Sequence, residues 1–176
     1  TALLAWANAA GAWILEDDYD GEYRYAGHPL PALHSLDPEG RVLYAGTFSK
    51  VLFPGLRLAY LVVPQAHVHA FQVAVEQSLH AGCPELYQAV VAEFLVQGHF
   101  ARHVKKMRTL YARRRDQLVQ ALTVLEPDGL FVERRQGGMH LVIRSTRAEA
   151  DTAFARRLQA AGLAVQALST WSADGR

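Results

Sequence analysis

Lysine and cysteine are scarce in this chain. Only three lysines, Lys50, Lys105 and Lys106, accompany 15 arginines. The single cysteine, Cys83, excludes an internal disulfide and is compatible with a reducing cytoplasm, where we expect the protein to reside. No apolar run reaches the roughly 20 residues of a membrane-spanning helix. The formal net charge is only +1, so the overall balance does not call for a nucleic-acid partner.

What the sequence does contain is typical of a soluble globular protein, with 51% hydrophobic and 20% charged residues. Its 176 residues are enough for one sizeable domain. The sequence begins at Thr1, without an initiator methionine and within a predicted helix. We therefore expect a fragment of a longer protein.

Hydrophobic periodicity and turn residues predict a mixture of helices and strands, and so an α/β fold. Helices are predicted at residues 1–12, 32–36, 65–80, 84–96, 99–125 and 149–161. Strands are predicted at residues 13–17, 42–45, 56–63, 130–134, 139–144 and 163–168. We expect the first three strands in a mostly parallel sheet flanked by helices, and the last three in a small α+β layer. A boundary near residue 112, inside the long helix, divides the chain into residues 1–112 and 113–176.

The stretch at residues 43–60, LYAGTFSKVLFPGLRLAY, contains the isolated lysine, Lys50. A lysine on a turn between two buried strands loses solvation, which favours its neutral amine as a nucleophile and Schiff-base former. The hydroxyls of Thr47 and Ser49 and the guanidinium of Arg57 are suitable donors for a phosphate. The alternative is a surface lysine beside an ordinary hairpin, and this stretch alone does not separate the two.

A second stretch, WILEDDYDGEYRY at residues 13–25, ends an apolar strand in a cluster of acids. Ligands of open α/β sheets bind outside the carboxyl ends of the strands. An aspartate there can pair with a pyridinium nitrogen, as pyridoxal phosphate requires, and a phenol two residues on can reach the adjacent ring oxygen. An acidic turn that caps a helix is the alternative. Lys50 follows Asp17 by 33 residues, and the two stretches together favour the cofactor site.

The segments EDDYDGEYRY and GRVLYAGTFSKVLFPGLRLAYLVVP resemble the fold-type I pyridoxal-phosphate aminotransferase family. More closely, and over nearly the whole chain, the sequence resembles the aminotransferase-like domain of the MocR subfamily of GntR transcriptional regulators. It implies that Lys50 is the Schiff-base lysine. It also implies that Asp17 pairs with the pyridine nitrogen and that Tyr19 bonds the ring hydroxyl oxygen. Arg57, helped by Thr47, would hold the phosphate.

Asp18 is the rival of Asp17 for the ring nitrogen, because adjacent strand residues face opposite ways. The family pattern, with aspartate and tyrosine on one side, favours Asp17. The resemblance also makes residues 1–112 the C-terminal part of the large cofactor-binding domain and residues 113–176 an incomplete small domain. Gly137-Gly138 is a tight turn in a segment that faces the substrate in this family. The family's carboxylate-binding arginine is expected beyond residue 176.

Three functions remain open, with pyridoxal 5'-phosphate the implied cofactor of the first two. The first is an effector domain that senses an amine or amino acid by transaldimination at Lys50. The second is a stand-alone class I/II aminotransferase, which transfers an amino group between an amino acid and a 2-oxo acid. The third is a non-catalytic interaction domain. We expect a homodimer in the intact parent, with DNA bound only through an N-terminal winged helix that this chain lacks.

Two further features are weaker signals. His99 and His103 lie four residues apart on a predicted helix, a spacing that can hold a metal, but no third ligand accompanies them. We therefore predict no metal site. The arginines and lysines of the same helix could form a nucleic-acid surface. A solvated helix face is the favoured interpretation, because no aromatic residues interleave with these charges.

Overall fold

The computed structural model describes residues 2–28, 30–78, 85–133 and 135–173, so Cys83 lies outside the described residues. The chain forms two compact units. Unit 1 comprises residues 1–118 with 134–141, and unit 2 comprises residues 119–133 with 142–176. The predicted division of the parent protein at residue 112 remains a prediction.

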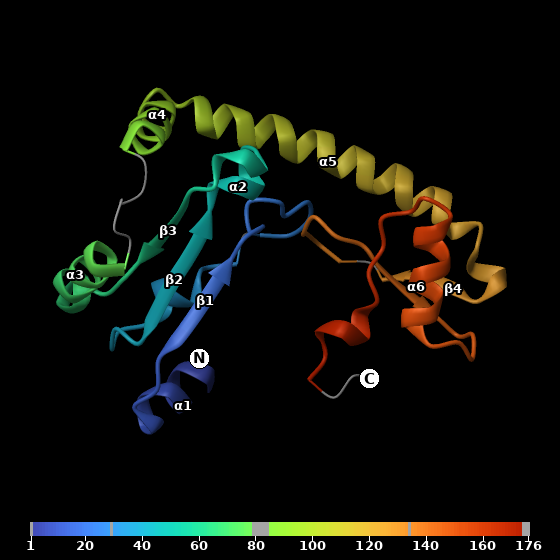
Figure 1. Ribbon diagram of the computed structural model, residues 1–176, viewed down its shortest axis with the longest axis horizontal. Coiled ribbons are helices and arrows are strands. Elements are labelled where there is room, and N and C mark those ends of the chain that lie inside the picture. Colours follow the sequence, from blue (N-terminus) through green and yellow to red (C-terminus); the bar gives the residue numbers. More distant parts are fainter. Residues whose placement is uncertain (1, 29, 79–84, 134, 174–176) are drawn as a thin grey trace. The chain divides into compact units, whose positions relative to one another are not determined.

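Unit 1 is built on a three-stranded sheet in the order β1-β2-β3 (Figure 1). Its strands are β1 (Ile14–Asp18), β2 (Val42–Thr47) and β3 (Ala59–Val62). β1 and β2 are parallel, whereas β2 and β3 are antiparallel. The sheet of unit 1 is therefore mixed, with one strand pair of each kind.

Acidic side chains fix the long connection between β1 and β2. The two carboxylate oxygens of Glu16 accept the backbone N–H groups of Leu33 at 2.8 Å and His34 at 2.9 Å, at the start of the 3₁₀ helix η1 (Leu33–Leu36). The carboxylate of Asp37 accepts the N–H of Val42, the first residue of β2, at 2.8 Å. These bonds satisfy backbone donors within the connection and at the start of β2.

The predicted helices of unit 1 are present, with small differences at their ends. They are α1 (Ala2–Ala10), α3 (Val68–Ser78), α4 (Glu85–Val96) and α5 (His99–Thr123). The 3₁₀ helix η3 (Gln65–His67) precedes α3. A one-turn helix that was not predicted, α2 (Phe48–Val51), follows β2 directly. None of the helices in the described part of the chain combines the length and the apolar character that crossing a bilayer requires.

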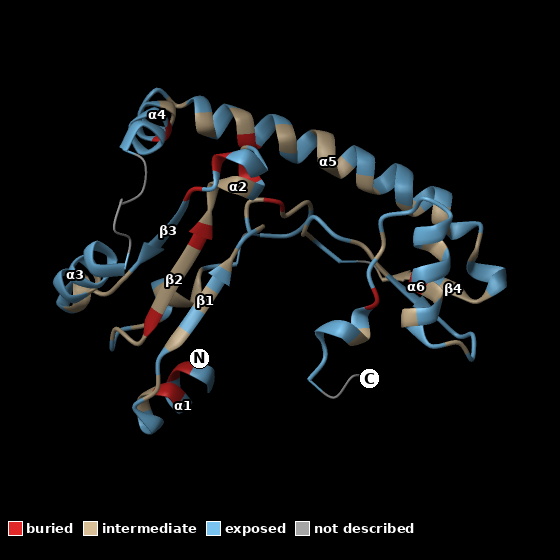
Figure 2. Cartoon of the chain, viewed as in Figure 1, coloured by how far each residue is buried: buried red, intermediate tan, exposed pale blue. Residues whose placement is uncertain are grey.

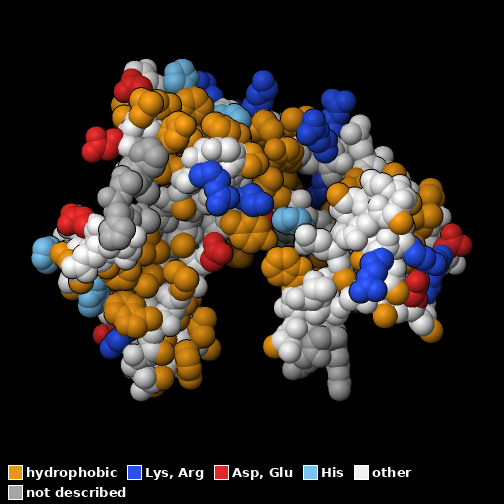
Figure 3. Space-filling model, viewed as in Figure 1, with side chains coloured by type: hydrophobic (Ala, Val, Ile, Leu, Met, Phe, Trp, Pro, Cys, Tyr) orange, Lys and Arg blue, Asp and Glu red, His pale blue; other side chains and the backbone are white. Residues whose placement is uncertain are grey.

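The core of unit 1 is small (Figure 2). One cluster joins Leu56, Leu58 and Val91, with Phe48 and Leu52 packed against it. Much apolar surface stays uncovered. β3 is exposed along its length, and hydrophobic side chains lie at the surface over α4 and the adjoining part of α5 (Figure 3).

The strand predicted at 56–63 begins only at Ala59. Residues Pro54–Leu56 form the 3₁₀ helix η2 instead, because Pro54 at its start fixes a helical φ. Arg57 then adopts a left-handed conformation. This local geometry makes the chain turn before β3 can pair with β2.

Unit 2 contains an antiparallel pair of strands and one helix. They are β4 (Leu130–Glu133), β5 (Val142–Ser145) and α6 (Asp151–Ala160), with the 3₁₀ helices η4 (Glu126–Asp128) and η5 (Leu168–Trp171). α6 ends before Gly162, whose φ of 86° is the left-handed conformation predicted for a helix C-cap.

The strand predicted at residues 163–168 is wrong. Residues 163–167 form no strand, and η5 begins at Leu168. Local bonds occupy the backbone groups that a neighbouring strand would use. The N–H of Val165 bonds the Leu163 carbonyl at 3.1 Å, and the Val165 carbonyl accepts the side-chain amide of Gln159 at 2.7 Å. The strand predicted at 139–144 begins later, at Val142, because the Met139 N–H bonds to Asp20 in unit 1.

Candidate functional site

The register of the sheet brings the predicted site residues to one end of it. These residues are Asp17, Tyr19, Thr47, Lys50 and Arg57. Asp17 pairs with Ala45 on the neighbouring strand, and Thr47 pairs with Ala59. Lys50 lies in α2, which continues β2, and Arg57 comes two residues before β3 begins. Tyr19 directly follows β1. The carboxyl ends of β1 and β2 and the start of β3 thus lie at the same end of the sheet, and ligands of α/β sheets bind outside the carboxyl ends of the strands.

The two adjacent aspartates of β1 have different surroundings. Asp18 uses both carboxylate oxygens within the fold: Oδ1 accepts the Gly21 N–H at 2.8 Å, and Oδ2 accepts the Tyr44 hydroxyl at 2.9 Å. Asp17 points to the opposite face of the sheet and is exposed. Its carboxylate, and not that of Asp18, is the one available to a ligand. The pairing of Asp17 with the ring nitrogen remains a prediction.

Lys50 is not buried by this chain. The prediction that it occupies a turn between two buried strands is wrong: Lys50 lies in α2 and is exposed. The reason is that α2 turns Val51, which is 2% exposed, toward the core and leaves Lys50 on its outer side. The strand that follows, β3, is itself exposed. The described residues therefore place the amine at the surface.

Thr47 and Arg57 shape the backbone on either side of α2. The Thr47 hydroxyl caps α2 by accepting the Ser49 N–H at 3.1 Å, and it donates to the Leu58 carbonyl at 3.4 Å. Arg57 has a φ of 51° and is the one non-glycine residue with a positive φ among those described. Left-handed backbone is strained for residues other than glycine, and such strain gathers at functional sites.

An aromatic network packs at the end of β1, on the face of the sheet opposite to Asp17. The Tyr60 ring packs 6.2 Å from the Tyr44 ring and 5.3 Å from Phe48. Gly46 makes this packing feasible, because a Cβ at that position would overlap the Tyr60 ring. Burial and the hydrogen bond to Asp18 raise the pKa of the Tyr44 phenol. Tyr44 thus remains a protonated donor to Asp18.

The structure also brings in a residue that the sequence analysis missed. The ring of His140 lies 6.3 Å from the ring of Tyr19, edge to face. The turn Gly137-Gly138 places it there: the Gly138 N–H bonds the Tyr23 carbonyl at 2.9 Å, and a Cβ on Gly137 would lie 2.9 Å from that same oxygen. The Gly-Gly pair was the signal in the sequence, since glycine permits such a close backbone approach.

The charged groups at this edge suit a ligand that carries a phosphate, a carbonyl and a ring nitrogen. In the described part of the chain, neither Asp17, Lys50 nor Arg57 forms an ion pair, so their charges are not neutralised within the fold. Arg57 and Thr47 offer phosphate donors, Lys50 an amine, and Asp17 a carboxylate. The donor set therefore fits pyridoxal phosphate.

The two histidines of α5 make separate local contacts. His99 Nδ1 lies 2.7 Å from Arg102, whereas His103 Nε2 lies 3.0 Å from the carbonyl of Val51 in α2. The described residues contain no cluster of three metal-ligating side chains. Several basic residues of α5 also have local roles. Arg108 donates to the Glu22 carbonyl at 2.9 Å, and Arg115 lies over the ring of Tyr25.

Curated relatives include several regulators. The probable rhizopine catabolism regulatory protein MocR of Rhizobium meliloti is 43% identical over 168 residues, which are 95% of this chain and 34% of that protein. The pyridoxine biosynthesis regulator PdxR of Corynebacterium glutamicum is 35% identical over 99% of this chain and 38% of its own length. The chain thus spans about a third of these relatives.

Solved structures confirm the predicted fold class. A kynurenine aminotransferase of Pyrococcus horikoshii is 31% identical and superimposes with a TM-score of 0.80, over 92% of this chain and 40% of that one. The α-aminoadipate aminotransferase LysN of Thermus thermophilus is 30% identical, with a TM-score of 0.76 over 90% of this chain and 41% of that one. The family description Aminotransferase class I and II matches residues 1–176. The chain belongs to the aminotransferase class I and II family.

Proposed function

We propose that this chain is the cofactor-binding part of a MocR-type transcriptional regulator, and that it senses a small amine or amino acid at Lys50. One observation carries the proposal: Lys50, Asp17 and Arg57 are exposed residues of separate segments that lie at the same end of the sheet, where β1 and β2 finish and β3 begins. The similarity to regulators along nearly the whole chain supports it. The structure of LysN in complex with N-(5'-phosphopyridoxyl)-L-leucine supports the choice of cofactor.

Each site residue has a defined task in this proposal. When bound, pyridoxal phosphate supplies an aldehyde that condenses with amines and a ring that withdraws electrons. Lys50 offers its amine to the aldehyde, and Asp17 stabilises a proton on the ring nitrogen. Arg57 donates to the phosphate. Thr47, whose hydroxyl reaches the Leu58 carbonyl only at 3.4 Å, can turn its O–H to the phosphate as well. Tyr19 donates to the ring hydroxyl oxygen.

Ligand sensing follows from amine exchange at this site. A small ammonium ligand would give up a proton in taking the place of Lys50, and the released Lys50 amine would take up that proton and its positive charge. That charge lies at the end of α2, next to the core residues Val51 and Leu52. We propose that the change in charge biases the conformation of the parent protein. We further propose that the parent is a homodimer and that it contacts DNA through a segment outside this chain.

A second candidate is a stand-alone aminotransferase. It is favoured by the aromatic-amino-acid aminotransferase 1 of Thermococcus litoralis, 35% identical over 78% of this chain and 33% of that protein. In that case Lys50 also acts as a general base on the substrate α-proton. The same five residues serve both functions, so the site does not separate them. Transfer of an amino group to added 2-oxo acids, measured with the full reading frame, would favour the enzyme.

The cofactor site is tested by reducing pyridoxal phosphate onto Lys50 with borohydride. The protein expressed from its full reading frame is mixed with pyridoxal phosphate, reduced with borohydride and mapped by peptide mass spectrometry. We expect a visible absorption band and one modified lysine, Lys50. Lys50→Ala should abolish both, whereas Lys105→Ala, which removes an exposed lysine of α5, should change neither. Equal spectra from the wild-type protein and Lys50→Ala would instead favour a non-catalytic interaction domain.

A further inference from the structure

Helix α2, which carries Lys50, is too short to persist through its own hydrogen bonds. It spans four residues, and its closing backbone bond runs from the Leu52 N–H to the Phe48 carbonyl at 2.8 Å. Nucleating one helical turn fixes several backbone dihedrals for a single bond, so isolated segments of this length do not persist in water. The placement of Lys50 therefore depends on groups outside α2.

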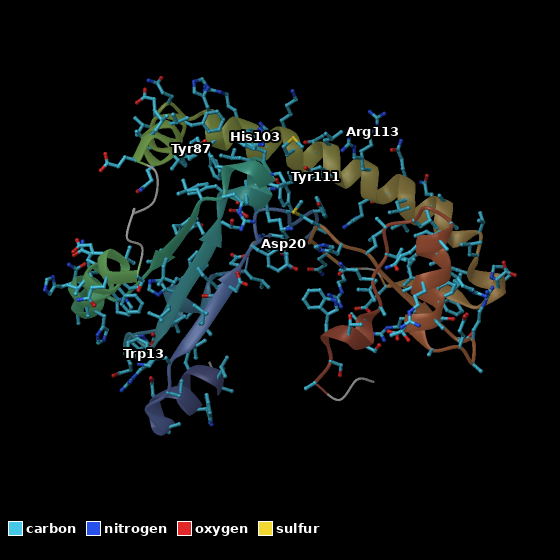
Figure 4. The ribbon with its side chains drawn as sticks, in the orientation of Figure 1. Trp13, Asp20, Tyr87, His103, Tyr111 and Arg113 are labelled. Carbon is cyan, nitrogen blue, oxygen red and sulfur yellow. The ribbon has the colours of Figure 1, made fainter. Side chains whose placement is uncertain are left out.

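Two donors from distant segments of unit 1 meet at the carbonyl of Val51, the last residue of α2. His103 Nε2, on α5, lies 3.0 Å from that oxygen, and the Tyr23 hydroxyl lies 3.4 Å from it. Because a carbonyl oxygen only accepts, His103 must carry a proton on Nε2. Figure 4 shows His103 on the part of α5 that passes beside α2.

This junction is enclosed. Val51 is 2% exposed and Tyr23 is fully buried, while the half-buried His103 ring packs edge-on against Phe94 at 6.5 Å. Water cannot readily replace a lost donor at such a carbonyl, so the missing bond would stay unmade. At the other end of α2, the Phe48 N–H bonds the Leu58 carbonyl at 2.9 Å. The helix is thus held at both ends, and His103 supplies the shorter of the two bonds at the lysine end.

We propose that His103 is a positioning residue for Lys50, acting through the Val51 carbonyl; the proposal rests on the proposed function of Lys50. His103 does not touch the cofactor. Its bond fixes the last carbonyl of α2, and so fixes the backbone one residue from the reacting amine. Losing the bond lets α2 unwind while the rest of unit 1 stays folded. Lys50 then samples positions from which the amine no longer meets the cofactor.

The test combines one measurement without cofactor and one with it, on the full-reading-frame protein. Amide hydrogen exchange of Leu52 reports whether α2 is intact. Borohydride fixation of pyridoxal phosphate on Lys50 reports whether its amine is placed. For His103→Phe, which keeps the ring but loses the donor, we expect Leu52 exchange about tenfold faster and the apparent affinity for fixation about tenfold weaker. His103→Gln, whose amide can reach the same carbonyl, should restore both to within about threefold.

His99→Phe is the matched control, because His99 lies one turn away on α5 and bonds Arg102 instead of α2. It should change neither measurement. The Ile14 amide, bonded to the Arg41 carbonyl at the start of the sheet, tests for general destabilisation. Unchanged Leu52 exchange in His103→Phe, or equal acceleration at Ile14 and Leu52, would overturn the role of His103.

Two further outcomes are also decisive. Should His103→Phe fail to fold, His103→Asn, whose amide is too short to reach Val51, takes its place and must differ from His103→Gln for the proposal to stand. A wild-type protein that fixes no cofactor on Lys50 would overturn the proposed function alone. The exchange rates at Leu52 would then still support or overturn the anchoring of α2 by His103.

Discussion

At the scale of single residues, neighbours in the sequence have separate tasks. Asp17 and Asp18 share one strand, yet Asp18 is engaged by Gly21 and Tyr44 while Asp17 faces outward. Likewise Val51 is buried while Lys50 beside it is exposed. In each pair one side chain is bonded or buried within the fold, and the other is exposed and available to a ligand. Substitutions at the two members should therefore change different measurements.

The two aspartates allow a direct comparison. Asp17→Ala should slow amine exchange at Lys50 about tenfold or more, because the ring nitrogen loses a charged partner, and should weaken cofactor capture less. The exchange rate is followed by absorbance and the capture by titration with pyridoxal phosphate. Equal losses in both would argue against the pyridinium role.

Asp18→Asn is the control for this comparison. It disturbs the bonds to Gly21 and Tyr44, so we expect the free energy of unfolding to fall by about 1 kcal/mol. Urea unfolding measures this change. The rate of amine exchange should stay near that of the wild-type protein at temperatures where both are folded. A slower rate with unchanged stability would reassign the ring nitrogen to Asp18.

Arg57 should show a conflict between stability and binding. Its left-handed φ of 51° strains any residue with a Cβ. Arg57→Gly should therefore be more stable to urea than Arg57→Ala by about 1 kcal/mol, since both remove the guanidinium but only glycine relieves the strain. Both variants should bind pyridoxal phosphate more weakly than the wild-type protein. Equal stability of the two variants would show that the backbone at residue 57 is not strained.

At the scale of elements, the lack of a side chain at Gly46 in β2 makes room for the Tyr60 ring of β3. Gly46→Ala would place a methyl group inside the Tyr60 ring, which is already packed against Tyr44 and Phe48. We expect a loss of about 1–3 kcal/mol in the free energy of unfolding, measured in urea. Adding Tyr60→Leu should recover part of that loss, because the smaller side chain makes room. Losses that simply add would exclude a clash between these two positions.

Elements with their own periodicity could be predicted from the sequence, whereas those that depend on partners could not. The stripe of apolar residues in α5 predicted a helix that indeed begins at His99. The apolar run at residues 163–168 resembled a strand, but strands need a neighbour, and local bonds of Val165 were made instead. The exposure of Lys50 was also unpredictable, because it depends on which side of α2 faces the core.

At the scale of the whole molecule, the two units of this chain bury little of their apolar surface. Leu15 is 64% exposed on the same sheet face as Asp17, and Val96 is 83% exposed on α4. Exposed strands and apolar patches promote association. The chain spans about a third of the length of its curated relatives, which is consistent with such surfaces having partners elsewhere in a longer protein.

The stability of the protein should fall in alkali because of its buried phenols. Burial, followed by the neighbouring Tyr111 and Glu22, raises the pKa of Tyr23 to about 12, whereas its ordinary value is 10.0. Between these values the unfolded chain loses the phenolic proton and the folded chain keeps it. The contribution of Tyr23 to the free energy of unfolding is therefore fully present below pH 10 and declines toward pH 12. Tyr23→Phe should reduce this decline without abolishing it, because the pKa of Tyr44 is raised too.

Chemical unfolding between pH 8 and pH 11.5 would measure that slope, with exposed Tyr87→Phe as the control that leaves it unchanged. A slope equal in Tyr23→Phe and in the wild-type protein would contradict the assignment.

The acceptor that joins α2 to α5 belongs to the main chain. An alanine scan through the lysine segment removes side chains but keeps that backbone oxygen, so a loss at position 51 would report the buried Val51 side chain and not the junction. The donor that this oxygen accepts from lies 52 residues away in the sequence, on α5. A search for residues that govern Lys50 therefore has to begin on the opposite helix.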